Sequence, residues 1–534
     1  MYIIALKYHF IQSARLISFL TLISRILGLL RDAVGLAVLG TGGYGIFLVG
    51  FMIPNLFRRL FGEGALSAAM VPVYTETLHN DEPSARRLVR SVLTVLTVFL
   101  FCLTVLLLCG VAAWWHLCSD GTDEQRTLAI LIAMMLPYVI LICLVAAAGG
   151  VLNVHKKFFS VAIAPVILNI CLIISFYLIY TQASKEVVSI DTLYICALAV
   201  LVAGVIQLGM QLWPMKKLGI VLVPLWETKG KAFKKIKSLM VPMVIGLSVV
   251  QVNVLFDTIL TYTLMATPTS GDTFVCFGKT IVYPVAYGGV AQLHIAQRLY
   301  QFPLAIIGIA LTTAIFPLLS LHATKKQKEA FSSVVSQGIR LVFFLAIPSA
   351  IGLIMIREPL ISMLKHGKVT HEDVLLSSGA LLFYACGLVS YFLQQLVVKS
   401  YYAQHDAKTP AKVAMVMVLG NLVLNFILIW PLGIAGLALS TAITATIQVT
   451  ILLVIFKKRY DITMSIRLFE SIVKSVVATF AMVSVWWLGT ILLPVGAPTT
   501  ALGEVIYALG VTIPIYFIVS LIIKHPEAKS LIRR

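Results

Sequence analysis

The stretch "SRILGLLRD", residues 24–32, places two arginines and one aspartate inside an otherwise apolar segment. On a helix that turns 100° per residue, residues seven positions apart lie nearly on one stripe. The aligned pairs are Ser24 with Arg31 and Arg25 with Asp32. A second polar set follows in the next apolar segment, made of Asn55, Arg58, Arg59 and Glu63. Because arginine presents a planar fork of donors suited to bidentate phosphate contacts, the pattern predicts binding of an anionic ligand.

The composition shows in which solvent these charges lie. The chain has 534 residues, of which 60% are hydrophobic and only 12% are charged, and its mean hydropathy is +0.99. A soluble globular protein needs more polar surface than this. Apolar stretches of about 20 residues, the length of a membrane-spanning helix, recur along the whole chain. We therefore predict an all-α integral membrane protein with fourteen transmembrane helices, since a barrel would show alternating polarity instead.

The distribution of positive charge predicts the topology. Lys and Arg number 41 against 22 Asp and Glu, and most of them fall in alternate connections, such as Arg86–Arg90 and Lys216–Lys237. This asymmetry is the positive-inside rule, and an even number of spans then puts both termini in the cytoplasm. The basic excess reflects topology first and attraction to anionic membrane lipids second. Nucleic acid is not an expected partner, because no basic patch sits on a folded soluble domain.

Several kinds of chemistry are not indicated. The sequence "FGKT" at residues 277–280 has Thr273 where a nucleotide-binding loop requires its first glycine. The histidines and cysteines show no metal-ligand spacing, and no catalytic constellation is visible. We therefore expect neither an enzyme nor a cofactor. Cys118 and Cys276 fall in loops predicted to lie outside the cell, and the sequence leaves open whether they form a disulfide.

The sequence contains an internal repeat. "ALSAAMVP", residues 65–72, recurs as "ALTTAIFP", residues 310–317, and each copy follows an element that contains an apolar residue before a proline. Parallel repeats of six spans each enter the membrane from the same face. The predicted organisation is a first lobe over residues 1–215, a cytoplasmic linker and second lobe over 216–460, and two further helices over 461–534.

The charge balance within the spans points to a cargo. A charged side chain at a helix centre costs about 2.5–3.5 kcal/mol on insertion scales, so such residues usually face a water-filled cavity or the bundle interior. The alternative is that the acidic residues neutralise the arginines in buried pairs, or that the arginines reach the membrane surface, as is plausible for Arg59 near a helix end. Arg25, Arg31, Arg58 and Arg298 outnumber Asp32 and Glu63. An excess of positive charge favours a phosphate or diphosphate head group.

Five motifs together resemble a known family. They are "SRILGLLRD", "IPNLFRRLFGEGALSAAMVPVY", "GGVLNVHKKF", "AIAPVILNI" and "QRLYQFPLAIIGIAL". The chain is similar to the MurJ or MVF family of bacterial lipid II flippases, within the MOP exporter superfamily. The resemblance implies fourteen helices in two lobes around a central cavity. It also implies transport of undecaprenyl-diphosphate-linked disaccharide-pentapeptide to the outer leaflet for peptidoglycan synthesis.

The resemblance also implies a set of site residues. Carried over by motif, the substrate-binding residues are Ser24, Arg25, Arg31, Asn55, Arg58 and Arg298. The residues for gating or ion pairing are Asp32, Arg59, Glu63, Gln297 and Gln301. The chain departs from the family where Gln297, Gln301 and Gly45 replace acidic residues, which leaves the cavity more positive and bears on gating or ion coupling. Residues 266–292 look like an insertion, so the alignment of Arg298 depends on "RLYQFP" alone.

The expected mechanism is alternating access in a monomer of the bacterial inner membrane, with the lipid tail along a groove made by the last two spans. Energy is expected from the membrane potential or from a gradient of Na⁺ or H⁺. A sodium site is one interpretation of Asn421 and Asn425 with Asp257 or Asn253; packing of amides between helices is the other.

Three alternative functions remain open. A polysaccharide flippase of the O-antigen type would share the lipid-diphosphate cargo. A MATE-like ion-coupled drug exporter would export cations, for which acidic or aromatic residues suit the cavity better than arginines. A scaffold or signalling protein without transport activity would tolerate neutralisation of the arginines.

Overall fold

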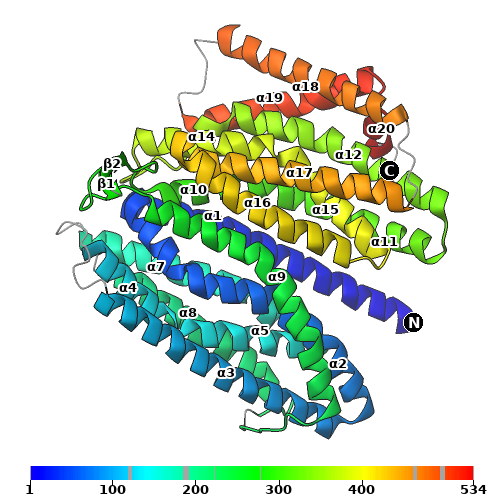
Figure 1. Cartoon of the computed structure of the whole chain (residues 1–534). Helices are drawn as coiled ribbons and strands as arrows, with labels where there is room; N and C mark the ends of the chain where they lie inside the picture. Colours follow the sequence, from blue (N-terminus) through cyan, green and yellow to red (C-terminus); the bar gives the residue numbers. More distant parts are fainter. Residues whose placement is uncertain are drawn as a thin grey trace. The chain divides into compact units, whose positions relative to one another are not determined.

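The computed structural model describes residues 2–117, 123–183, 192–221, 223–276, 278–460, 466–492 and 500–532 (Figure 1). Helices dominate it. In chain order the elements are α1 (Tyr2–Phe57), η1 (Arg58–Ala65), α2 (Leu66–Asn80), α3 (Glu82–Leu117), α4 (Asp123–Met135), α5 (Tyr138–Val154), α6 (Phe158–Ala162), α7 (Ala164–Ala183), α8 (Leu193–Lys217), α9 (Lys231–Thr263), β1 (Thr273–Cys276), β2 (Lys279–Val282), α10 (Gly289–Pro303), η3 (Leu304–Gly308), α11 (Ile309–Thr324), α12 (Lys328–Met355), α13 (Arg357–Ser362), α14 (His371–Cys386), α15 (Leu388–Ala403), α16 (Lys408–Leu432), α17 (Ile434–Tyr460), α18 (Ile466–Leu492), α19 (Ala501–Ile522) and α20 (Pro526–Ile532).

The chain divides into two compact units. The first contains Met1–Tyr262 and Thr267–Gly271, and the second contains Thr263–Ala266 and Asp272–Arg534. The first unit therefore includes α1 to α9, and the second includes α10 to α20. This division follows packing, whereas the predicted boundary after residue 215 follows the sequence repeat. The three-part organisation predicted from the repeat stays a prediction.

The structure confirms an all-α membrane protein but not the count of fourteen helices. Within the described residues, eleven helices are long and apolar enough to cross a membrane, or twelve if α14 and α15, bent by 44°, form one span. The first of these, Leu16–Asn80, covers 65 residues and includes both of the first two predicted spans. At 1.5 Å per residue this length is about 98 Å, far more than one crossing needs.

A break at Gly40 separates α1 into two helical parts. Gly40 has φ 71° and ψ 176°, a conformation open essentially to glycine alone. In a continuous helix Tyr44 would lie about 18 Å along the axis from Asp32. Instead the Tyr44 hydroxyl lies 2.7 Å from Asp32 Oδ1, and its ring covers Gly35, where an added Cβ would meet a ring carbon at 2.6 Å. The chain therefore changes direction at Gly40.

Small residues let helices approach closely in the first unit. Helix α5 packs against both α2 and α8, and its segment Ala146–Gly150 is buried. A Cβ on Gly204 of α8 would meet the Tyr138 ring at 2.7 Å. Without a hydrophobic driving force between helices in lipid, such close packing is what holds spans together. Gln207 of α8 adds a polar contact, because its Nε2 donates to Ala164 O at 2.6 Å where α6 gives way to α7.

Helix α15 lies at the centre of the second unit. Its residues Leu388, Phe392 and Leu396 are fully buried and form one hydrophobic cluster with residues of α12 and α17. The Tyr401 hydroxyl donates to Leu452 O of α17 at 2.8 Å. Many large apolar side chains elsewhere are exposed, for example Phe469 and Phe480 of α18, as expected of a surface that faces lipid. Helix α18 packs against α12 and α19 (Figure 1).

Each unit contains a π-helical segment next to its copy of the repeated octapeptide. The first unit has η1 between Pro54 and Pro72, and the second has η3 between Pro303 and Pro317. In the first unit η1 ends at Ala65, where the octapeptide begins, and in the second unit η3 ends at Gly308, just before the octapeptide begins at residue 310. Insertions of this kind in a helix frequently occur at functional sites and at kinks. The two copies of the repeat therefore resemble each other in local structure, since each adjoins a π-helical segment, as well as in sequence.

Residues 266–292, predicted as an insertion, contain a β-hairpin. Strands β1 and β2 pair antiparallel, with Thr273 opposite Val282 and Cys276 opposite Lys279. The Phe274 and Tyr283 rings pack with their centroids 4.8 Å apart. Cys276 has a free thiol. Cys118, with which the sequence left a disulfide open, lies outside the described residues.

We predict that Gly40→Ala destabilises the protein by about 1–3 kcal/mol, because a Cβ is strained at this φ and ψ. The measurement is the thermal unfolding midpoint of purified protein in detergent. Gly110→Ala is the matched control, because an added Cβ there meets nothing within 4 Å and the backbone is helical. Equal midpoints for the two variants would contradict the assignment of a strained break at Gly40.

Candidate functional site

Arg31 forms a buried ion pair with its neighbour Asp32. Arg31 Nε donates to Asp32 Oδ1 at 2.9 Å, and Nη2 contacts the same oxygen. The side chains are only 11% and 5% exposed. A buried charge in a helix bundle needs a partner with opposite charge, and the next residue supplies it. Arg31 is therefore balanced within the first unit and does not contribute to the excess of positive charge predicted for the set.

Two further side chains complete this cluster. The Tyr44 hydroxyl donates to Asp32 Oδ1 at 2.7 Å from beyond the Gly40 break. Asn169 of α7 accepts from Arg31 Nη1 at 3.2 Å and donates through Nδ2 to Ser24 O at 3.0 Å. The cluster therefore joins both parts of α1 to α7. Ser24 contributes its backbone carbonyl to these contacts.

Arg58 and Asn55 lie where α1 passes into the π-helical η1. Arg58 Nε and Nη2 donate to Asn55 Oδ1 at 3.1 and 3.0 Å, and both residues are half-buried. An amide oxygen orients a guanidinium group without cancelling its charge. Arg59 is also half-buried, and the side chain of Glu63 lies outside the described residues. The structure thus brings together Asn55 and Arg58, two members of the predicted polar set.

Arg25 differs from Arg31 in its surroundings. Its side chain is exposed on α1, and among the described residues no hydrogen bond or ion pair of Arg25 is present. A guanidinium with open donors retains its full capacity for a bidentate contact with an oxyanion. In the first unit, Arg25 and Arg58 are therefore better placed than Arg31 to hold an anionic group.

Arg298 lies on α10 of the second unit beside a group of tyrosines. Its side chain is exposed, as is that of Gln301, whereas Gln297 is half-buried and donates to the Tyr384 hydroxyl at 3.0 Å. The Tyr300 ring stacks on the Tyr384 ring with centroids 4.6 Å apart. Gln297, which replaces an acidic residue according to the resemblance, thus fixes α10 against α14.

Asn421 and Asn425 form a buried amide and hydroxyl network between α16 and α17. Asn425 Nδ2 donates to Asn421 Oδ1 at 3.0 Å, and Asn421 Nδ2 donates to Ser440 Oγ at 2.9 Å. These bonds are what packing of polar groups between membrane helices requires. Asp257 is buried in α9 of the first unit, whereas the two asparagines belong to the second. A sodium site that combines them stays a prediction.

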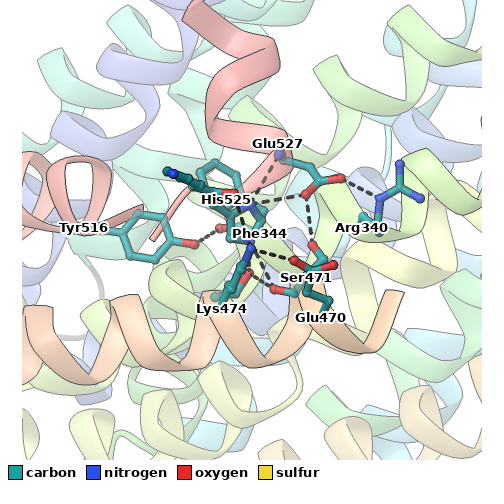
Figure 2. A network of polar contacts seen from close by, with 10 residues as sticks. Arg340, Phe344, Glu470, Ser471, Lys474, Tyr516, His525 and Glu527 are labelled. Carbon is teal, nitrogen blue, oxygen red and sulfur yellow. Dashed lines mark hydrogen bonds and ion pairs between the residues drawn. The ribbon is translucent and has the colours of Figure 1, made fainter. Parts of the chain in front are cut away.

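A second polar cluster, which the sequence reasoning missed, ties the C-terminus to α12. Figure 2 shows Arg340 of α12 pointing toward Glu527 of α20, with Nε 2.6 Å from Oε1. Ser471 of α18 donates to Glu527 Oε2 at 3.0 Å. Buried His525 places Nε2 3.0 Å from Ser471 O, so Nε2 carries the hydrogen of this contact. We name these four residues the C-terminal cluster.

The C-terminal cluster controls the charge of Glu527. Burial opposes ionisation of this carboxyl group, yet hydrogen bonds from His525, Arg340 and Ser471 and the charge of Arg340 outweigh it and lower the pKa of Glu527. A buried ion pair of this kind is better evidence that the packing position of the helices is specified than that the fold is stabilised. The C-terminal cluster thus fixes how α18 and α20 dock on α12.

The comparisons with known proteins decide the family. The family model described as "Lipid II flippase MurJ" matches residues 36–502 of this chain. The chain belongs to the MurJ family. The match covers both compact units and reaches into α19. The resemblance read from the five sequence motifs is thereby confirmed.

Relatives agree with this assignment over most of their length. A protein of Vibrio cholerae named "Probable lipid II flippase MurJ" is 31% identical over 466 residues, which are 85% of this chain and 84% of the relative. The "Lipid II flippase MurJ" of Burkholderia cenocepacia is 32% identical over 455 residues, 83% of each chain. These relatives thus align with more than four fifths of this chain.

Solved structures show the same fold. A structure of "Lipid II flippase MurJ, inward closed conformation" has a TM-score of 0.74 at 24% identity and covers 95% of this chain and 98% of its own. A MATE multidrug transporter of the MOP superfamily, in an inward-facing conformation, has a TM-score of 0.65 at 14% identity and covers 82% of this chain and 94% of its own. The MurJ family and the MATE transporters thus share the architecture seen here.

Some site residues left only weak signals in the sequence. Asn169 lies inside the motif "AIAPVILNI", so its presence was noted but its contact with Arg31 was not. Tyr44 follows three glycines within a short segment, which is the one hint of a break in the helix. Glu527 and His525 fall in a short polar tail whose partner Arg340 is 187 residues away from Glu527. No spacing rule connects residues so distant.

We predict that Asp32→Asn destabilises the protein by about 3–5 kcal/mol, because it leaves the Arg31 charge buried without its counterion. The double variant Arg31→Met with Asp32→Leu removes both charges and is expected to recover at least half of this loss. The measurement is a double-mutant cycle on unfolding in detergent. A double variant that is no more stable than Asp32→Asn would show that the two residues act independently.

A second prediction concerns the pH dependence of the C-terminal cluster. Because the folded-state pKa of Glu527 lies below its ordinary value of 4.5, its stabilising effect is fully present above pH 4.5 and is lost as the pH falls through the folded-state pKa. Glu527→Gln lacks this effect. The difference in thermal midpoint between parent and variant should therefore be largest near pH 7 and shrink below about pH 4.5. A difference that is constant from pH 7 to pH 3 would contradict the pairing.

Proposed function

We propose that this chain is a lipid II flippase of the bacterial inner membrane, which moves the lipid-linked peptidoglycan precursor from the inner to the outer leaflet. The observation that carries the proposal is membership of the MurJ family across both compact units. Relatives named lipid II flippases at 31% and 32% identity support the same activity. The transport involves no covalent step, so the protein acts as a transporter and not as an enzyme.

We propose that exposed or amide-oriented arginines recognise the diphosphate of the cargo. In the first unit these are Arg25, which is exposed, and Arg58, which Asn55 orients. In the second unit Arg298 is exposed on α10. Charge-assisted hydrogen bonds from guanidinium to phosphate are stronger than neutral ones and can be bidentate. Arg31 is proposed to have a positioning role. Through its contacts with Asp32 and Asn169 it positions α1, which carries Arg25.

The conformational change is proposed to be alternating access by a monomer. Each unit has prolines next to a π-helical segment, and such irregularities let a membrane helix bend while neighbours satisfy its backbone. The arginines would take the head group from the inner leaflet and release it at the outer one. The lipid tail would stay in hydrocarbon along α18 and α19, whose outer faces are apolar.

Energy is proposed to come from the membrane potential or an ion gradient. Moving one charge through 100 mV provides about 2.3 kcal/mol. With Gln297 and Gln301 in place of acidic residues, the part of α10 next to Arg298 has no carboxylate of its own. Within α10, the charge next to a bound diphosphate would therefore come from Arg298.

Two other transport functions are less well supported. MATE transporters share the fold at 14% identity or less among the structures compared here, which is evidence for architecture alone. Exporters of cations would also be disfavoured by exposed arginines such as Arg25 and Arg298. An O-antigen type flippase would use the same diphosphate chemistry, so the cargo must be tested directly.

The test is complementation of bacteria depleted of their own lipid II flippase. The parent chain is expected to restore growth, and Arg25→Ala, Arg58→Ala and Arg298→Ala are each expected to reduce lipid II export by at least about tenfold, the effect of losing one charged hydrogen bond. Arg87→Ala is the matched control, because Arg87 is exposed and bonded only to Ser84 in its own helix among the contacts described.

The outcomes separate the candidate functions. Rescue by the parent and the control, with failure of the three well-folded arginine variants, supports the proposal. Failure of the parent at normal membrane levels would refute lipid II as the cargo. Rescue that is indifferent to all three arginines would remove them from the transport site while leaving the family assignment intact. Membrane levels and detergent melting curves show that each variant is folded.

A further inference from the structure

The connection between α8 and α9, which we call the strap, is held to α3 by hydrogen bonds. Arg90 Nε donates to Val223 O at 3.0 Å, and Leu225 N donates to Thr94 Oγ1 at 3.0 Å. Ser91 Oγ donates to Glu227 O at 2.8 Å and also accepts from Glu227 N at 3.2 Å. The described residues of the strap, 218–221 and 223–230, therefore have a defined conformation although they contain little regular structure.

The ends of the strap are fixed as well. At its start Gly219 adopts φ 73°, and the Arg86 guanidinium lies so close that an added Cβ would meet Nη1 at 2.6 Å. Beyond its end, Lys235 of α9 forms an ion pair with Glu76 of α2, with Nζ 2.7 Å from Oε2. These contacts bring one end of α2, α3, α8 and α9 together. The strap lies at this end of the first unit.

The strap and its flanks carry a dense set of exposed cations. Seven lysines lie between residues 216 and 237, all of them exposed, against one acidic residue, Glu227. One of the seven, Lys235, is already paired with Glu76. The others are Lys216, Lys217, Lys229, Lys231, Lys234 and Lys237. This end of the unit is the side that the positive-inside rule assigns to the cytoplasm.

Apolar and aromatic side chains are exposed among these lysines. Trp213 and Trp226 are 66% and 62% exposed, and Val221 and Val223 are about half exposed. Lys217 Nζ lies 3.7 Å from the centroid of the Trp213 ring. Tryptophan prefers the boundary between hydrocarbon and lipid head groups. Trp213 occupies the last turns of α8, which is where a spanning helix meets that boundary.

We propose that Trp213, the strap and the first turns of α9 form a binding surface for anionic phospholipids of the cytoplasmic leaflet. The tryptophans and valines enter the head-group region, and the lysines contact lipid phosphates. Lysine suits this task because it acts as a point charge that adapts to many head groups, whereas arginine favours a fixed bidentate geometry. The surface does not depend on which lipid the protein transports.

A bilayer fits this surface better than an acidic protein does. The exposed apolar side chains lie beside the end of a spanning helix, so the adjoining solvent is the lipid boundary itself. The basic groups extend from residue 216 to residue 237 and form no single pocket, which matches a sheet of head groups. A juxtamembrane basic segment near an anionic surface gains attraction from each lysine added.

The experiment uses the full chain in nanodiscs of phosphatidylethanolamine and phosphatidylglycerol, with native mass spectrometry to measure enrichment of bound phosphatidylglycerol. The quadruple variant Lys229→Gln, Lys231→Gln, Lys234→Gln, Lys237→Gln is expected to lose at least about tenfold in enrichment, since each lysine near an anionic surface contributes a factor of roughly five. The matched control replaces four other exposed lysines by Gln, namely Lys408, Lys412, Lys457 and Lys458. It is expected to lose clearly less enrichment than the quadruple variant, because no tryptophan lies beside these lysines in the sequence to hold them at the head groups.

A photo-crosslinking residue at position 226 identifies the occupant in cells. A phospholipid adduct that disappears in the quadruple variant supports the proposal. A protein adduct at this position would overturn it in favour of an acidic partner. Equal loss of enrichment in the quadruple variant and in its control would overturn it as well, because net charge alone would then explain binding. Lipid II export measured in parallel reports on the transport function separately.

Discussion

The cost of keeping a charged side chain away from water is the constraint on which the rest of this structure depends. Arg31 meets it by pairing with Asp32, and Arg340 meets it by pairing with Glu527. The first pair is linked to Tyr44 beyond the Gly40 break and to Asn169 of α7, and the second joins α12 to α20. Removal of one partner from such a pair is far more destabilising than replacement of both. Charge pairing therefore organises the helices, while arginines with an exposed or amide-oriented guanidinium group remain for binding.

This distinction changes how the arginines are interpreted. Sequence reasoning grouped Arg25, Arg31, Arg58 and Arg298 as one cationic set. The structure separates a positioning residue, Arg31, from residues with an exposed guanidinium, Arg25 and Arg298, and from one oriented by a neutral amide, Arg58. These three suit recognition of an oxyanion better than the buried, ion-paired Arg31 does. The inferred anionic cargo thus rests on fewer residues, each with a clearer role.

Local patterns predicted what depends on local physics. Apolar length predicted spanning helices, and the repeated octapeptide lies next to a π-helical segment in each unit. The polar set of the second apolar segment was identified, and the structure adds the contact between Asn55 and Arg58. What depends on a change of chain direction was not predicted: Tyr44 reaches Asp32 only because Gly40 interrupts α1. The C-terminal cluster was also missed, since it depends on tertiary packing of a short polar tail.

The central claim is that the guanidinium groups of Arg25, Arg58 and Arg298 recognise the diphosphate of a lipid-linked cargo. Its most direct measurement is the affinity of purified protein for undecaprenyl diphosphate, compared with the combined variant Arg25→Ala, Arg58→Ala, Arg298→Ala. The account predicts a loss of at least about a hundredfold, because hydrogen bonds to charged groups contribute about 1.5–3 kcal/mol each. A folded triple variant that binds this lipid as tightly as the parent would contradict it.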